Sequence, residues 1–133
     1  MAKLIANVDG GARGNPGPAA IGVVLRRPGG EVLEEVGERI GHATNNVAEY
    51  KALLRGIELA LAHGAGELEL IGDSELVVRQ IEGRYKVKDA GMKELHAEAK
   101  GALGSFASWS IRHVRRAENA DADRLVNQAL DAG

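Results

Sequence analysis

The feature that most constrains this chain is the order of its hydrophobic periodicities. Residues 3–8 and 19–27 are rich in Val, Ile and Leu, and a Pro-Gly-Gly turn at 28–30 joins the second run to residues 31–39. Such runs predict three consecutive antiparallel strands. Helical spacing begins only in residues 46–62, where apolar side chains recur at every third or fourth position. The chain therefore opens as a strand meander and then changes to helices.

The remainder of the chain alternates strands with helices. We expect strands at residues 67–71 and 109–114, and helices at residues 74–81, 93–103 and 119–130. A meander followed by this alternation predicts an α/β fold with one mixed sheet: three antiparallel strands, then two strands linked by helices, with helices on its faces. With 133 residues, 44% of them hydrophobic, the chain is expected to form a single domain over residues 1–133.

Composition excludes several classes of function. The chain has no cysteine, which excludes disulfides, thiolate metal ligands and cysteine nucleophiles and fits a reducing compartment. No apolar run approaches the ~20 residues needed to span a bilayer, so we expect a cytoplasmic protein with no membrane partner. The net charge of −2 argues against a generic nucleic-acid binder. Contact with a polyanion would therefore require local basic patches or bound cations.

Three acidic residues stand at unusual positions. Asp9 and Asp73 each follow a predicted strand, and Glu49 falls on the inward face of the predicted helix. Each has a local interpretation: Asp9 as an acidic turn residue, Asp73 as a helix N-cap, and Glu49 as part of a capping box with Asn46. Taken one at a time, Asp9 and Asp73 favour the local interpretation, and Glu49 fits a capping box as well as it fits a functional role.

The joint placement of the acids points to metal chemistry. If the strands that precede Asp9 and Asp73 are neighbours, both carboxylates lie at the same edge of the sheet. Carboxylates a few ångströms apart repel and raise each other's pKa unless divalent cations neutralise them, and Mg²⁺ prefers an all-oxygen shell. Two such ions ~4 Å apart suit phosphodiester hydrolysis. This interpretation also reconciles an acidic protein with a polyanionic substrate.

The glycine-rich segment of residues 9–18 does not match a phosphate-binding P-loop. It lacks the Gly-Lys-Ser/Thr ending of that motif, and Pro16 and Pro18 prevent a following helix. Its glycines instead allow the backbone to bend and to approach a ligand closely.

Four motifs carry a family resemblance over almost the whole chain. They occur in the family's order and spacing: Asp9-Gly-Gly-Ala-Arg-Gly-Asn-Pro-Gly-Pro, Thr44-Asn-Asn-Val-Ala-Glu-Tyr, Gly72-Asp-Ser, and Asn119-Ala-Asp-Ala-Asp-Arg-Leu. The chain resembles type 1 ribonuclease H, the ribonuclease HI family, in its short form. The resemblance implies a ribonuclease H-like, mixed five-stranded sheet. It also implies a monomeric endonuclease that hydrolyses the RNA strand of RNA/DNA hybrids, leaving 5′-phosphate and 3′-hydroxyl ends.

The resemblance also implies the residues of the site. Asp9, Glu49, Asp73 and Asp123 would bind two Mg²⁺ ions, with Mn²⁺ as an alternative, and carry the catalysis. Asp121 and Asp123 lie at opposite edges of the apolar arc of the last predicted helix, so helical geometry does not choose between them. The family motif selects Asp123.

Recognition of a hybrid requires distinguishing ribose from deoxyribose through the 2′-hydroxyl. By resemblance, Gly11, Asn15, Asn45 and Glu49 would contact that hydroxyl, and Thr44 and Asn46 would lie near the DNA strand. Plain helix capping is the alternative for residues 44–46. The full set implied to bind substrate is Gly10, Gly11, Asn15, Thr44, Asn45, Asn46, Ser74, Glu75 and Asn119.

Two departures from the family affect substrate binding. Many relatives have Gln where this chain has Glu75, which would place a negative charge beside the substrate. Larger relatives also insert a basic protrusion after the position of Gly83, and this chain lacks it. Binding of the polyanion would then depend on a small set of basic residues: Lys86, Lys88, Arg112, Arg115 and Arg116. The alternative interpretation of these residues is an ordinary solvated, charged face.

A third departure concerns a mobile histidine that relatives carry in a long loop before the last helix. Here the connection is the short Arg115-Arg116-Ala117-Glu118. We expect Arg115 or Arg116 to substitute electrostatically, with Arg116 favoured because it is nearer the helix. An exposed, merely solvated arginine is the alternative. His113 alternates with strand residues of one face and is expected to be structural.

Two rival functions remain. The first is a catalytically inactive or differently specific nucleic-acid-binding module of the same fold, although all four acids are present. The second is another metal nuclease such as a junction resolvase, which would leave residues 44–46 unexplained.

Overall fold

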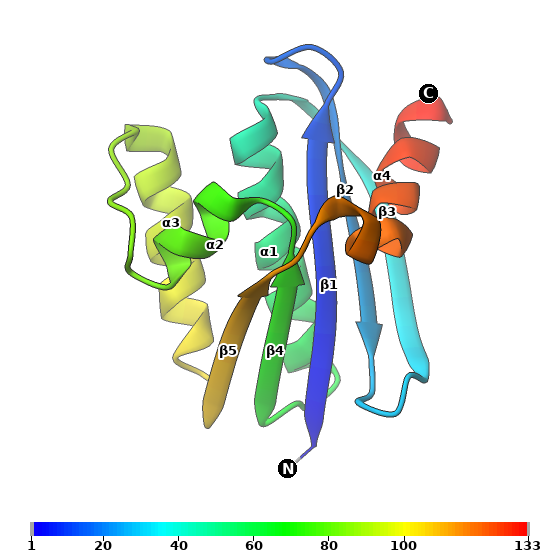
Figure 1. The fold of residues 1–133 in the computed structure, drawn as a ribbon, viewed down its shortest axis with the longest axis vertical. Coiled ribbons are helices and arrows are strands. Elements are labelled where there is room, and N and C mark those ends of the chain that lie inside the picture. Colours follow the sequence, from blue (N-terminus) through cyan, green and yellow to red (C-terminus); the bar gives the residue numbers. More distant parts are fainter. Residues whose placement is uncertain (1, 133) are drawn as a thin grey trace.

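Five strands form one mixed sheet in the computed structural model, which describes residues 2–132 (Figure 1). The helices lie on both faces of this sheet. In chain order the elements are β1 (Lys3–Ala12), β2 (Gly17–Arg26), β3 (Val32–Ala43), α1 (Asn45–Ala62), β4 (Glu67–Gly72), α2 (Glu75–Ile81), α3 (Ala90–Leu103), β5 (Ser108–His113), the 3₁₀ turn η1 (Arg116–Asn119) and α4 (Ala120–Asp131).

The strand order across the sheet is β3-β2-β1-β4-β5. β1, β2 and β3 pair antiparallel, whereas β4 pairs parallel with β1, and β5 pairs parallel with β4. The antiparallel meander and the two strands linked by helices are thus confirmed. β1 lies at the centre, between an antiparallel and a parallel neighbour. Because β1 and β4 run parallel, their carboxyl ends point to the same edge of the sheet.

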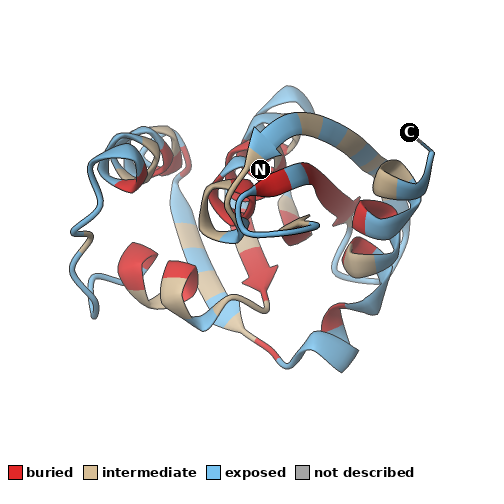
Figure 2. Ribbon diagram, turned by 90° about the horizontal axis from the view of Figure 1, so that it is seen from above, coloured by how far each residue is buried: buried red, intermediate tan, exposed pale blue. Residues whose placement is uncertain are grey.

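Helices α1 and α4 cover opposite faces of the sheet, and α3 packs outside α1 (Figure 1). Buried residues concentrate in the central strands and on the helix sides that face them (Figure 2). Tyr50, Leu53 and Ile57 of α1 are fully buried, as the periodicity predicts. Leu61 departs from the prediction: it is 38% exposed, although Ala60 of the same turn is fully buried. No helix within residues 2–132 is long and apolar enough to cross a membrane.

Three element boundaries differ from the predictions by three residues or more. β1 does not stop at Val8 but continues to Ala12, because β2 remains paired with it as far as Ala19. β3 extends beyond Arg39 to Ala43, since it stays paired with β2 past a bulge. The third helix begins at residue 90 and not at residue 93, because the Asp89 carboxylate caps it by accepting a hydrogen bond from the Met92 N–H at 3.0 Å.

Two glycines allow the helices to approach the sheet closely. A Cβ on Gly10 would lie 2.2 Å from the Ala48 carbonyl oxygen of α1, and a Cβ on Gly22 would lie 2.2 Å from the Ala122 carbonyl oxygen of α4. Both clashes would be with backbone, which cannot turn aside as a side chain can. Each contact involves the residue directly before an acidic residue, Glu49 on α1 and Asp123 on α4. Glycine therefore determines how far both acids reach over the sheet.

Replacing Gly22 should destabilise the protein because the added methyl group forces α4 off the sheet. We expect Gly22→Ala to lower the free energy of unfolding by about 1 to 3 kcal/mol. Gly101 provides the matched control, since it lies in α3 and a Cβ added there would meet no heavy atom within 4 Å. Gly101→Ala should raise stability by about 0.5 to 1 kcal/mol. Urea unfolding of both variants measures the two effects, and an equal change in both would contradict the close approach.

Candidate active site

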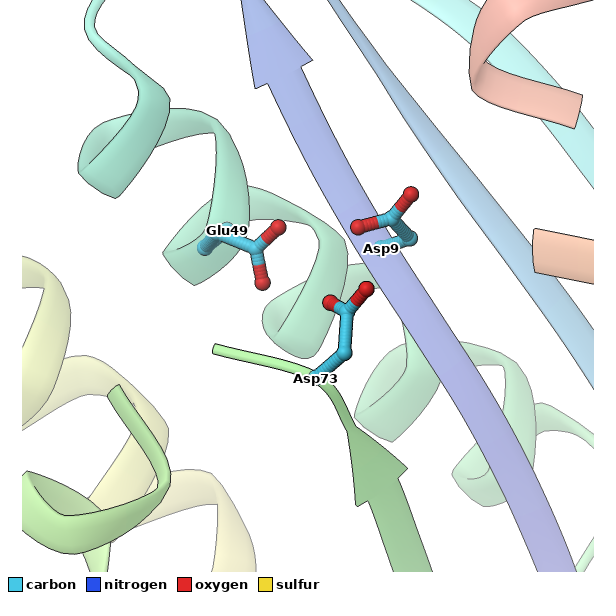
Figure 3. Close-up of side chains that lie close together, drawn as sticks. All are labelled: Asp9, Glu49 and Asp73. Atoms are coloured by element: carbon cyan, nitrogen blue, oxygen red, sulfur yellow. The ribbon is translucent and has the colours of Figure 1, made fainter. Parts of the chain in front are cut away.

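Three carboxylates meet at the edge of the sheet where β1 and β4 part. The parallel pairing of these strands ends at Val8 and Gly72, so the next residues, Asp9 and Asp73, lie side by side. Glu49 reaches the same place from the first turns of α1 (Figure 3). One oxygen from each of the three carboxylates lies within 4.8 Å of the others. The acids that the sequence placed at two strand ends and one helix face therefore converge.

The local interpretations of the three acids are wrong. Asp9 lies within β1 and not in a turn. The N-cap of α2 is Ser74, whose Oγ accepts from the Val77 N–H at 3.4 Å, so Asp73 does not cap the helix. Glu49 does not reach back along its own helix: its Oε1 accepts a hydrogen bond from the Gly10 N–H at 2.9 Å.

Helix α1 obtains its cap from a different residue of the same motif. Thr44 Oγ1 accepts a hydrogen bond from the Val47 N–H at 3.2 Å, which leaves Glu49 free to turn toward the sheet. The capping alternative for Thr44 is thus correct, and the acid five residues later is held by β1.

Burial and mutual repulsion make this cluster electrostatically costly. Asp9 is 5% exposed and Glu49 is 9% exposed. Burial, reinforced by the nearby Glu49 and Asp73, raises the pKa of Asp9 to about 10. Burial likewise raises the pKa of Glu49 to about 7, against the opposing effect of its hydrogen bonds with Asp9 and Gly10. Three crowded carboxylates whose oxygens can share one centre are a donor set that fits a hard divalent cation.

The fourth predicted acid lines the same cleft. Asp123 projects from α4, with a quarter of its side chain exposed, and forms an ion pair of 3.0 Å with Arg116. Asp121 is exposed and lines a different depression beside Asn7 and Arg26. The cleft has a volume of about 410 Å³, and its charged and polar lining consists of Asp9, Arg13, Asn45, Asn46, Glu49, Asp73, Ser74, Arg116, Asp123 and Asn127.

Two asparagines tie the glycine-rich loop to the start of α1. Asn45 Oδ1 accepts a hydrogen bond from the Ala12 N–H at 2.8 Å, and Asn15 Oδ1 accepts from the Asn45 N–H at 2.9 Å. These reciprocal bonds fix residues 13–17 against the helix. Gly10 and Gly11 also line the cleft beneath them.

Two other residues expected at the substrate lie elsewhere. Glu75 does not line the cleft; its carboxylate is 4.0 Å from the Arg79 guanidinium, one turn along α2. Asn119 is only 2% exposed, and its Nδ2 donates to the Val8 carbonyl at 2.9 Å. Its amide is therefore directed into the protein.

The two candidate substitutes for the mobile histidine face different surroundings. Arg116 lines the cleft and bonds to Asp123 through both Nε and Nη2, at 3.3 and 3.0 Å. The Arg115 side chain is 86% exposed and pairs with Glu118 at 3.1 Å. His113 is half-buried at the end of β5 and does not line the cleft.

The sequence analysis missed two residues of the cleft. Asn127 donates from Nδ2 to the Asp123 carbonyl at 3.1 Å, and its position four residues after Asp123 on one helix was an available signal. Arg13 also lines the cleft and pairs with Asp131 at 2.6 Å. No local pattern links Arg13 to Asp131, because 118 residues separate them.

Comparisons with known proteins agree with this arrangement. The family described as Reverse transcriptase-like matches residues 7–129. Ribonuclease HI of Halobacterium salinarum is 47% identical over 97% of this chain and 65% of that protein. The crystal structure of RNase H1 from the same archaeon matches with a TM-score of 0.96 at 45% identity, over 98% of this chain and 99% of that one. LC11-RNase H1, solved in complex with an RNA/DNA hybrid, matches with a TM-score of 0.92 at 45% identity, over 97% of both chains.

The chain is shorter than several of these relatives. It spans 65% of the length of the Halobacterium protein and 36% of a bifunctional protein of Mycobacterium tuberculosis that is 45% identical to it. The matches nevertheless cover nearly all of the chain itself, and they confirm the ribonuclease H-like fold that the four motifs implied. The chain therefore belongs to the ribonuclease H family, within the group described as reverse transcriptase-like.

Proposed function

We propose that this chain is a metal-dependent endonuclease that hydrolyses the RNA strand of RNA/DNA hybrids. The observation that carries the proposal is the cluster of Asp9, Glu49 and Asp73 in one cleft with Asp123. Similarity to a ribonuclease H1 solved with a hybrid supports the choice of substrate.

The four carboxylates would hold two Mg²⁺ ions, with Mn²⁺ as the alternative. Bound there, the ions would supply an activated water and stabilise the leaving oxygen, which yields 5′-phosphate and 3′-hydroxyl ends. The chain contributes the geometry. The Gly10 N–H holds one oxygen of Glu49, while the β1–β4 pairing holds Asp9 beside Asp73. Neither restraint depends on a cation.

Recognition of the ribose would come from the loop that is fixed to α1. The oxygens of the Asn15 and Asn45 amides already accept backbone hydrogen bonds. This leaves the Nδ2 donors of both amides for the 2′-hydroxyl, together with Gly11 and the Glu49 carboxylate. Thr44 and Asn46 would lie toward the DNA strand, and Gly10 and Ser74 would border the scissile phosphate.

Grip on the backbone of the hybrid would fall to cations outside the cleft. Lys86 and Lys88 lie in the exposed segment after α2, and Arg112 lies on β5. These side chains would act through long-range attraction, which salt screens. Glu75 would weaken this attraction modestly, since Arg79 offsets its charge.

Arg116 would replace the absent histidine by charge. It cannot shuttle protons near neutral pH, because a guanidinium does not deprotonate there. It can neutralise charge that develops on a leaving phosphate, and it already faces the carboxylates of the cleft.

A cleavage assay with a labelled RNA/DNA hybrid tests the proposed function. With Mg²⁺ the wild-type chain should cut only the RNA strand, and a chelator should abolish cutting. Asp123→Asn should lower turnover by about a hundredfold or more, because it removes a metal ligand. Asp121→Asn is the matched control on the same helix and should retain turnover. Cleavage of a branched DNA in preference to the hybrid would contradict the assignment, as would the reverse ranking of the two variants.

The two adjacent arginines allow a second matched comparison. Arg116→Ala should lower turnover at saturating hybrid by about tenfold or more, because the charge at the cleft is lost. Arg115→Ala should leave turnover unchanged and at most raise the Michaelis constant, because its side chain points to solvent. Steady-state kinetics separates the two effects. Unchanged turnover in Arg116→Ala would disprove the substitution by charge.

The raised pKa values predict how pH changes the stability of the metal-free protein. Asp9 and Glu49 hold their protons in the folded chain to about pH 10 and 7, whereas the unfolded chain releases them near pH 4. The stability that these two protonated groups contribute is fully present below pH ~4 and is lost as the pH rises toward their pKa values in the folded chain. The free energy of unfolding should therefore fall between pH 5 and 7, by up to about 1.4 kcal/mol per pH unit for each protonated group.

Urea unfolding at a series of pH values, with a chelator present, measures this slope. Asp9→Asn should flatten it, and millimolar Mg²⁺ should raise the stability of the wild type at pH 8. A stability that rises with pH over the same window would show that the carboxylates are not crowded as described.

A further inference from the structure

The segment that joins β5 to α4, residues 114–119, crosses β4 and β1 of the sheet (Figure 1). Two hydrogen bonds tie it to the strands beneath. The Val114 N–H donates to the Gly72 carbonyl at 3.0 Å, and Asn119 Nδ2 donates to the Val8 carbonyl at 2.9 Å. The two accepting residues directly precede two of the clustered aspartates. The connector is therefore bonded to the residues directly before Asp9 and Asp73.

This connector determines where two residues of the cleft lie. Arg116 stands between the two attachment points, and Asp123 follows four residues after the second, one turn into α4. The two side chains bond to each other. Arg116 reaches the cleft from this connector, which no strand pairing holds, and Asp123 reaches it from the first turn of α4, which packs on the sheet at Gly22. The attachment at Asn119 fixes the connector and the start of that helix relative to the clustered carboxylates.

Two further side chains orient the Asn119 amide. Its Oδ1 accepts a hydrogen bond from Asn7 Nδ2 at 3.0 Å, and Asn7 Oδ1 in turn accepts from Arg26 Nε at 3.2 Å. The arginine can only donate, so it determines which way the Asn7 amide points. Asn7 then presents its NH₂ group to Asn119, which directs the second NH₂ group to the Val8 carbonyl. The orientation passes in one direction from β2 through β1 to the start of α4.

We propose that Asn7 is a positioning residue for this site: through Asn119 it holds the connector so that Arg116 and Asp123 stand over the acidic cluster. Asn7 lies outside the cleft and contacts neither a clustered carboxylate nor Asp123. The inference rests on the proposed hybrid cleavage only for its kinetic readout. Loss of the Asn7 amide leaves the buried Asn119 oxygen without its donor, which frees the second amide to turn.

A double-mutant cycle between Asn7 and Asn119 tests this relay. At saturating Mg²⁺ and hybrid, Asn7→Ala and Asn119→Ala should each lower turnover by about tenfold or more, with the Michaelis constant for hybrid within about twofold of wild type. The double variant should lose no more than Asn119→Ala alone, because one residue acts through the other. Lys3→Ala is the matched control: it lies on the same strand and face, pairs with Glu69, and should retain wild-type turnover.

Hydrogen exchange of the metal-free protein provides a readout that does not depend on activity. The N–H groups of Val114 and Glu118, which bond to Gly72 and Arg115, should exchange at least about tenfold faster in Asn7→Ala. The amides of α1 should not change. If Asn7→Ala does not fold, Arg26→Ala replaces it, with the same directions and smaller effects that vanish in an Asn119→Ala background.

Several outcomes would overturn the relay. Unchanged exchange in the connector, additive losses in the cycle, or a raised Michaelis constant with normal turnover would each exclude a positioning role for Asn7. Failure of the proposed function looks different: the wild type would not cut the hybrid, while the exchange measurement would still show whether Asn7 holds the connector.

Discussion

The mutual repulsion of three crowded carboxylates, two of them buried, is the constraint on which the arrangement of this protein depends. Asp9, Glu49 and Asp73 would separate if their backbones were free to move, since like charges repel and burial further disfavours the ionised forms of Asp9 and Glu49. They are held by parts of the fold that respond little to side-chain electrostatics. The parallel pairing of β1 with β4 fixes two of them, and the contact of α1 with Gly10 fixes the third. The hydrophobic core behind the sheet thus opposes the repulsion at its edge.

The fourth carboxylate is held in a different way. Asp123 is partly exposed, stands on a helix that follows a short connector, and is paired with Arg116. It therefore adds little to the repulsion in the metal-free protein. The site divides into a part built into the sheet and an attached part, whose position depends on the packing of α4 against the sheet and on a few polar side chains at the start of that helix. A cation bound between them would link the two parts, and the polar relay below the cleft keeps them within reach of each other.

The sequence predicted those features that depend on local periodicity. The helix over residues 45–62 was recognised because its apolar spacing is long and regular, and the meander because its turns contain glycine and proline. Asp9 was predicted at the end of a strand because Gly10 and Gly11, which follow it, have low strand propensity. In the structure the strand continues to Ala12, because its backbone stays paired with β2. The partner of Glu49 is a backbone N–H of residue 10, which is 39 positions away and carries no side-chain signal. Asn119 was predicted to bind substrate from the family motif alone. Its actual partners, Asn7 and Val8, lie at the other end of the chain, so no local pattern could indicate them.

Charge explains how an acidic cleft can be a site for a polyanion. Its lining contains four carboxylates and two arginines, Arg13 and Arg116, so its formal charge is −2 with every group ionised. Both arginines are paired with aspartates, which keeps their charge from attracting phosphate on its own. Two divalent ions would reverse the sign of the cleft to +2, and would also compete with Arg116 for Asp123, releasing the guanidinium toward the substrate. Cations held by these carboxylates would thus also change how the cleft meets a polyanion: a lining that repels phosphate would become one that attracts it.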